Sequence, residues 1–359
     1  MEQKFIKGLD LSEYFYTEAV RPILDHYFPS LPYSAALIGD GSDVLGFDTI
    51  QSTDHDWGPR LQLFLDETDL RAHREKIDQV LRQELPADIH GYTTNFAIYN
   101  DDVTYMNPVS DTPINHRVDI FSVKAFFAEV LNFDPMGEIR AVDWVSVPEN
   151  YFRKLTAGRV FYDGLGQLES IRAKLHYYPH DVWLYLLSMQ WQHISQEEHF
   201  MGRCGQVGDD LGSRLIAARL VRDLMRLCFL MERTYAPYIK WFGSAFSQLG
   251  CAATLAPIFS AVLEADTWKK REQQLSAAYE TIAEMHNALN ITEPLSPKVS
   301  DFYDRPFLVI NAGRFADTIR EKIKDPQVLA LPKLLGGFDQ FVDSTDALVY
   351  MDRIKAVYA

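Results

Sequence analysis

The chain has 359 residues, and its 35 Lys and Arg stand against 50 Asp and Glu, a net charge of −15 at pH 7. Residues 1–150 hold 11 basic and 26 acidic side chains, so the whole excess of acid lies there. Such a field repels phosphate backbones, which disfavours extended nucleic-acid binding. Because there is no long apolar run, no signal-like N-terminus and no regular cysteine spacing, the sequence predicts a cytoplasmic protein without membrane segments.

The first part of the chain is expected to alternate helices and strands. Apolar spacing predicts a helix over 11–28, capped by Ser12, and a strand over 33–38 that ends in a Gly-Asp-Gly-Ser turn. A second strand is expected over 53–65, with Gly58-Pro59 as a bulge or bend within it. A charged helix over 68–85 follows, then strands at 95–99, 103–106 and 116–123 and a helix over 124–131.

Helical periodicity dominates after about residue 148. Helices are expected over 150–162, 165–177, 180–200, 211–235, 240–262, 267–289 and 312–324, with a loop at 290–306. The fold class is therefore predicted to be α+β, with a mixed-sheet domain over 1–147 followed by an all-helical domain over 148–359.

Asp54-His55-Asp56 is the first candidate site. On an extended strand alternate side chains share a face, so the sequence predicts that Asp54 and Asp56 point the same way and His55 points away. Two adjacent carboxylates repel one another and favour a cation between them. Hard oxygen ligands of this kind suit Mg²⁺, which also binds the phosphate oxygens of a substrate.

Two further features complete the pattern. Gly41-Ser42 offers backbone N–H groups and a hydroxyl in a turn that could hold phosphates closely. Asp119 lies between Val118 and Ile120 on a predicted strand, where an acid is costly unless it faces a metal ion, a partner or solvent. Three carboxylates beside such a turn would suit metal-assisted phosphoryl or nucleotidyl transfer.

The order Gly-Ser, Asp-x-Asp, then a lone Asp resembles the DNA polymerase β-type nucleotidyltransferase superfamily. Residues 39–59 are similar to an uncharacterised bacterial branch of it, whose helical C-terminal domain is like that of antibiotic adenylyltransferases. The resemblance implies that Gly41 and Ser42 contact a triphosphate and that Asp54 and Asp56 bind Mg²⁺. It also implies that Asp119 is a third metal ligand or the general base. His55 and Trp57-Gly58-Pro59 depart from the usual pattern.

Two candidates lie in the helical half. Arg226 shares a helix face with Arg219, Arg222 and Arg233, a stripe that could neutralise a triphosphate or could be a solvated face paired with Asp223. Lys240 lies in a Tyr-x-x-Lys-Trp feature that resembles one in antibiotic nucleotidyltransferases, where a lysine reaches the phosphates. The alternative is a surface lysine beside core aromatic residues.

The expected function is Mg²⁺-dependent transfer of a nucleoside monophosphate from ATP or another NTP to a hydroxyl of a small-molecule acceptor. The acidic first domain makes a cationic acceptor electrostatically plausible. Two alternatives stay open: nucleotidylation of a macromolecule such as a tRNA end or a protein side chain, and a non-catalytic nucleotide-binding regulator.

Overall fold

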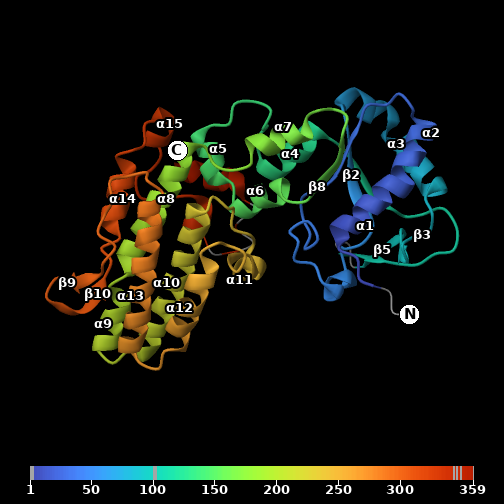
Figure 1. Ribbon diagram of the computed structural model, residues 1–359. Helices are drawn as coiled ribbons and strands as arrows, with labels where there is room; N and C mark the ends of the chain where they lie inside the picture. The colour runs from blue at the N-terminus through green and yellow to red at the C-terminus, as the bar shows by residue number, and fades with distance from the viewer. Residues whose placement is uncertain (1–3, 100–102, 343, 345–346, 348–349, 359) are drawn as a thin grey trace. The chain divides into compact units, whose positions relative to one another are not determined.

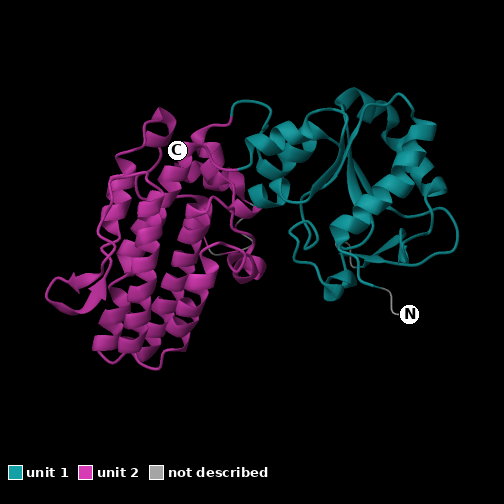
Figure 2. Cartoon of the chain, in the orientation of Figure 1, with its two compact units in different colours: residues 1–138, 151–176 teal, residues 139–150, 177–359 magenta. Residues whose placement is uncertain are grey.

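The computed structural model describes residues 4–99, 103–342, 344, 347 and 350–358. The chain divides into two compact units, coloured separately in Figure 2. Unit 1 comprises residues 1–138 and 151–176, and unit 2 comprises residues 139–150 and 177–359. The architecture is α+β, as the sequence predicts: one unit is built around a sheet and the other mainly from helices (Figure 1).

Unit 1 contains a four-stranded sheet in the order β7-β2-β1-β8. β2 and β7 are parallel, whereas β1 is antiparallel to both β2 and β8. Two short hairpins, β3 with β4 and β5 with β6, lie outside this sheet. The bounds of the strands are β1 Ser34–Leu37, β2 Arg60–Leu65, β3 Asp88–Ile89, β4 Tyr92–Thr93, β5 Phe96–Tyr99, β6 Val103–Met106, β7 Arg117–Ser122 and β8 Arg159–Asp163.

The first expected helix is observed as an unbroken helical run with a π-helical middle. It begins after Lys7 rather than at Ser12, so the predicted cap is wrong: Ser12 is buried inside the helix. The helices of unit 1 are α1 Gly8–Tyr14, η1 Phe15–Val20, α2 Arg21–Tyr27, η2 Ile50–Asp54, α3 Glu67–Glu84, α4 Val123–Leu131, α6 Glu149–Thr156 at the junction of the units, and α7 Leu168–Lys174.

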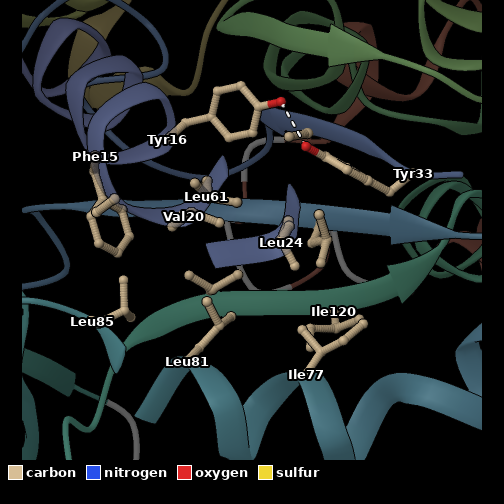
Figure 3. Packing of buried hydrophobic residues seen from close by; sticks show 14 of the residues in the cluster. Phe15, Tyr16, Val20, Leu24, Tyr33, Leu61, Ile77, Leu81, Leu85 and Ile120 are labelled. Carbon is tan, nitrogen blue, oxygen red and sulfur yellow. Dashed lines mark hydrogen bonds between the residues drawn. The ribbon is translucent and has the colours of Figure 1, made fainter. Parts of the chain in front are cut away.

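One face of the sheet is buried beneath the N-terminal helices and α3. Leu61 of β2 and Ile120 of β7 belong to this core together with Ile77 and Leu81 of α3 (Figure 3). Full burial of one such aliphatic side chain contributes about 1.5–3 kcal/mol. Because side chains alternate along a strand, the residues between these apolar ones point to the opposite face, and Asp119 of β7 is one of them.

Two sequence-based expectations for unit 1 are wrong. The strand expected over 53–65 begins only at Arg60, because residues 50–54 form a 3₁₀ helix and Asp56 and Gly58 have positive φ angles of 46° and 132°. The helix expected over 150–162 ends at Thr156, and the following residues form β8, which pairs with β1. The edge strand β8 of the sheet therefore comes from the part of the chain that follows α6.

Unit 2 is built mainly from long helices, of which α8, α10, α12 and α13 are drawn in Figure 1. The helix expected over 240–262 is interrupted between α11 and α12, and the expected loop at 290–306 contains the start of a β-hairpin. The elements are α5 Ala141–Ser146, α8 His180–Glu197, α9 Phe200–Gln206, α10 Asp210–Met231, η3 Ile239–Trp241, α11 Phe242–Phe246, α12 Ala252–Glu264, α13 Trp268–Ala288, β9 Ser300–Phe302, β10 Arg305–Val309, α14 Gly313–Arg320, α15 Pro326–Leu329, α16 Phe338–Phe341, α17 Met351–Lys355 and η5 Ala356–Tyr358. No helix in the described part of the chain is long and apolar enough to cross a bilayer.

Candidate functional site

A buried ion pair anchors the Gly-Ser turn. Arg60, the first residue of β2, donates from Nε and Nη2 to the two carboxylate oxygens of Asp43, at 3.3 and 2.8 Å. Both side chains are almost fully enclosed, and Arg60 Nη2 also donates to the backbone carbonyl of Asp40 at 2.8 Å. A bidentate contact of this kind fixes direction as well as distance, so the turn is held rigidly against the first residue of β2.

The turn depends on glycine at position 41. Gly41 has a φ angle of 138°, and a Cβ atom there would lie 2.1 Å from Asp43 Oδ1 and 2.2 Å from Arg60 Nη2. Ser42 is half-buried, and its carbonyl accepts a hydrogen bond from the N–H of Phe47 at 2.8 Å. Gly41 and Ser42 therefore form a turn with a fixed backbone, as the sequence predicts for residues 39–42.

A second buried carboxylate fixes the segment between the turn and the Asp-x-Asp pair. Asp48 accepts hydrogen bonds from the Gly8 N–H at 2.7 Å and from Trp57 Nε1 at 3.1 Å, and it pairs with Lys7 at 3.2 Å. Asp48 is 1% exposed, so these contacts compensate for the lost hydration of its charge. The N-terminal helix and the loop before β2 are thereby joined.

Asp54 and Asp56 lie in an exposed loop rather than on a strand. Asp54 ends the 3₁₀ helix, and its Oδ2 lies 3.0 Å from Nδ1 of His55. His55 thus turns toward its neighbour's carboxylate instead of lying on an opposite strand face. The alternation argument for a shared face does not apply, because the residues before Arg60 are not extended in register with the sheet.

The hairpin of β5 and β6 holds Asp56 in place. The N–H of Asp56 donates to the Thr104 carbonyl at 2.7 Å, while the N–H and the hydroxyl of Thr104 donate to Asp56 Oδ1 at 3.2 and 2.8 Å. Arg117, at the start of β7, places Nη1 3.4 Å from the same oxygen. Asp56 is therefore fixed between the hairpin and the edge strand of the sheet.

These contacts keep both carboxylates ionised. Desolvation is the largest single influence on Asp54 and raises its pKa, but the contacts with His55 together outweigh it and the net pKa is lowered. Desolvation likewise opposes the hydrogen bonds from Thr104 and the charge of Arg117 at Asp56, and the net pKa is again below the ordinary value. Both groups are thus anionic at neutral pH.

Asp119 lies in the middle of β7, opposite Gln62 of β2 in the register. Its side chain is exposed, and it shares a strand face with Arg117 two residues earlier. Arg117 thus connects the Asp56 loop with the strand face that carries Asp119. Within the described ranges, no group of three or more His, Cys, Asp and Glu side chains is close enough to share a metal ion.

The two other candidates belong to unit 2. Arg226 of α10 is largely buried, with Nη1 3.8 Å from Glu149 Oε1 and its guanidinium 5.6 Å from the centre of the Phe242 ring. Lys240 lies in η3 and is exposed, with Nζ 5.1 Å from the centre of the Trp241 ring. Arg226 is thus engaged within unit 2, whereas the ammonium of Lys240 is open to solvent.

Sequence reasoning missed the residues that hold the site together. Arg60 and Asp43 come together only through the fold, although an arginine at the start of a mainly apolar strand could have indicated a buried partner. Arg117 lies two residues before Asp119, so strand alternation alone would have put both on one face. The role of Thr104 depends on the hairpin contact and leaves no signal in the local sequence.

The chain is similar to one family model over part of its length and to a solved structure at low identity. Residues 144–242 match a family model described as a domain of unknown function (DUF4037), which includes α6, β8 and the helices to the start of α11. No protein with a curated description matches the chain. The chain is similar to the crystal structure of a nucleotidyltransferase-like protein from Exiguobacterium sibiricum 255-15, at 12% identity and a TM-score of 0.31, over 85% of this chain and 88% of that one.

Proposed function

We propose that the protein transfers a nucleoside monophosphate from ATP or another NTP to an acceptor hydroxyl and releases pyrophosphate. One observation carries the proposal: five acids, at positions 43, 48, 54, 56 and 119, divide into two groups by burial. Asp43 and Asp48 are enclosed and bound by protein groups, whereas Asp54, Asp56 and Asp119 are exposed. The exposed group is the one that a metal-bound triphosphate could reach.

The exposed residues fit Mg²⁺ in their chemistry. All three offer carboxylate oxygens, and the contacts around Asp54 and Asp56 favour the ionised form that binds a hard cation. Mg²⁺ is commonly held by one or two carboxylates together with substrate phosphates, so a complete protein cage is not required. When bound, the ion would neutralise charge on the triphosphate and orient it.

Groups of the protein itself would bind the phosphates and accept the proton of the acceptor. Gly41 and Ser42 offer backbone N–H groups and a hydroxyl toward the phosphates, on a turn that the Arg60–Asp43 pair keeps rigid. Asp119 would accept the proton of the acceptor hydroxyl as its oxygen bonds to the α-phosphorus and the bond to the pyrophosphate breaks. Lys240 is proposed as a phosphate contact on the resemblance of its Tyr-x-x-Lys-Trp feature alone. The contact of Arg226 with Glu149 instead supports a structural role.

Calorimetric titration of ATP, GTP, CTP and UTP, with and without Mg²⁺, tests the proposal. We expect Mg²⁺-dependent binding of at least one triphosphate to the wild type and loss of that binding in the double variant Asp54→Ala/Asp56→Ala. Because both side chains are exposed, the variant should stay folded. Failure of every triphosphate to bind would rule out the enzymatic function.

A further inference from the structure

A polar groove lies between α3 and β7 in unit 1. Its volume is about 540 Å³, within the range of small-ligand sites. Its two walls are the charged face of the helix and one edge of the sheet. The lining residues are Arg74, Glu75, Asp78, Gln79 and Arg82 of α3, with His116 and residues 118–121 of the β7 segment.

The groove follows the backbone of β7. Four consecutive residues of the strand, 118–121, line it. Because successive side chains on a strand point to opposite faces, a cavity that touches all four lies at the sheet edge rather than over one face. β7 is the terminal strand in the sheet order, and the groove therefore lies along its outer edge.

His116 shows which backbone groups point outward. The Val118 N–H donates to His116 Nδ1 at 3.2 Å, so it does not point toward β2. In a parallel ladder alternate residues bond to opposite neighbours, so the N–H and carbonyl of Ile120 also point toward the groove. The Val118 N–H is taken by His116, so the outer edge of β7 offers the groove the Ile120 N–H and the carbonyls of Val118 and Ile120, while Asp119 projects its side chain onto one face.

The helical wall is held rigidly against the strand. The His116 side chain is 1% exposed, and burial lowers its pKa although Asp78 opposes the shift, so the ring is neutral. Since Nδ1 accepts from Val118, Nε2 carries the hydrogen and points to the backbone carbonyl of Asp78 at 3.5 Å. Arg82 pairs with Asp78 at 2.7 Å and with Asn115 at 3.3 Å.

The uncommitted charges in the groove are mainly acidic. Of the charged residues that line the groove, Arg82 and Asp78 form an ion pair with one another. Within the described part of the chain, two acids, Glu75 and Asp119, and one base, Arg74, have no ion-pair partner. The neutral His116 adds no charge. A basic occupant therefore fits better than an acidic one.

We propose that the groove binds an extended peptide segment of an acceptor protein, which adds a strand to β7 and presents a hydroxyl side chain to Asp119. The occupant would carry Lys or Arg beside a Ser, Thr or Tyr. Backbone pairing would supply affinity, and alternate side chains would supply specificity. This inference rests on the proposed nucleotidyl transfer, and it departs from the small-molecule acceptor that the sequence favours.

The dimensions agree with a short peptide. Arg74 and Arg82 are separated by about 12 Å along α3, and residues 118–121 extend over about 10 Å of strand, which matches three or four extended residues. A residue paired directly opposite Asp119 would have its Cβ about 5 Å away on the same face. Its hydroxyl oxygen would bond to the α-phosphorus of the NTP, its proton would pass to Asp119, and pyrophosphate would leave.

The test measures binding without nucleotide. The probe is a fluorescein-labelled peptide of alternating Thr and Lys, and its control has the same sequence with N-methylated amides on alternate residues. Methylation removes the strand donors and keeps every side chain. Fluorescence anisotropy should show that the unmethylated peptide binds at least about tenfold more tightly. Equal affinities, or a Kd weaker than about 1 mM for the unmethylated peptide, would overturn the inference.

Matched variants locate the binding. Glu75→Lys reverses a charge in the groove, whereas Glu129→Lys makes the same change on α4, outside it. We expect the first to weaken peptide binding several-fold and the second to leave it unchanged. Equal weakening by Glu129→Lys would contradict the proposed location.

A transfer assay separates the two proposals. The peptide is incubated with Mg²⁺ and, in separate reactions, with ATP, GTP, CTP or UTP that is radiolabelled at the α-phosphate, and incorporation into Thr is measured. Groove binding without label transfer would mean that the proposed function is wrong while the groove is a peptide site. Label transfer to a small alcohol without peptide binding would support the proposed function and contradict the peptide acceptor.

Discussion

Arg117 Nη1 lies 3.4 Å from Asp56 Oδ1 and shares a strand face with Asp119. The Arg117 guanidinium thus contacts one exposed acid, Asp56, and lies on the strand face that carries another, Asp119. It favours the ionised form of Asp56, and it lies at the point where the loop before β2 meets β7. The two acids are expected to perform different tasks, because only Asp56 is held by the hairpin.

The first prediction separates binding from transfer. Asp119→Asn should still bind Mg²⁺ and the nucleotide, because Asp54 and Asp56 are unchanged, but it should transfer about 100-fold more slowly because a proton acceptor is lost. Asp56→Asn should lose affinity for the nucleotide. Titration together with radiolabel transfer would detect the difference. Equal loss of affinity in both variants would contradict the assigned roles.

The buried pair beneath the turn should dominate local stability. Arg60→Met leaves Asp43 enclosed without a counter-charge, which should cost about 3–5 kcal/mol of unfolding free energy. The double variant Arg60→Met/Asp43→Leu removes both charges and should recover most of that loss. Urea unfolding of the single and double variants measures the coupling. Additive losses would show that the two side chains act independently.

Gly41 and Gly46, at the two ends of the turn segment 41–46, form a matched pair. Both Gly41 and Gly46 have positive φ, but a Cβ at position 46 meets no atom within 4 Å. Gly46→Ala should therefore cost only the backbone term of about 1–2 kcal/mol. Gly41→Ala should cost more, by roughly 1–3 kcal/mol, because its Cβ overlaps Asp43 and Arg60. Equal thermal stabilities of the two variants would contradict this account of the turn.

His286 should make unit 2 sensitive to acid. Burial lowers its pKa to about 4, and its ring accepts from Trp191 Nε1 at 3.3 Å. Between about pH 6.5 and pH 4 the unfolded chain gains a proton that the folded state resists, so stability is full above pH 6.5 and falls as the pH drops. The loss should approach about 3 kcal/mol.

Denaturant unfolding between pH 4 and pH 8, followed by tryptophan fluorescence, tests this dependence. His286→Gln carries no titrating group at this position and should reduce the slope of the pH profile in that range, whatever its effect on absolute stability. His26→Gln, a change at an exposed histidine of α2, serves as the control and should keep the wild-type slope. An unchanged slope in His286→Gln would exclude His286 as the source.

Local patterns predicted most of the elements and the motif acids. The apolar periodicity of α3 and the alternation in β7 are strong enough to place both, and Asp119 lies on a strand as expected. β8 was not predicted, because its five residues follow a helix without a distinct pattern and are stabilised by pairing with β1 far along the chain. Asp54 and Asp56 lie off the strand because positive φ angles at Asp56 and Gly58 interrupt the extended backbone.

The supporting residues of the site depend on long-range contacts. Asp43 meets Arg60 through the fold, and Thr104 reaches Asp56 from a hairpin many residues away. A sequence pattern can indicate that an acid on a strand is unusual, but it does not name the partner that lies opposite. For this reason the exposed acids were found from the sequence and the groups that hold them were not.

Equilibrium dialysis of Mn²⁺, with and without ATP, against the protein tests the central claim most directly. Mn²⁺ replaces Mg²⁺ at oxygen sites, and the excess of Mn²⁺ on the protein side of the membrane measures the ion bound to the protein. We predict that ATP promotes Mn²⁺ binding to the wild type and to Asp25→Asn, an exposed control of equal charge change, but not to Asp56→Asn. Equal binding by all three proteins would show that the nucleotide site does not include Asp56 and would contradict the account.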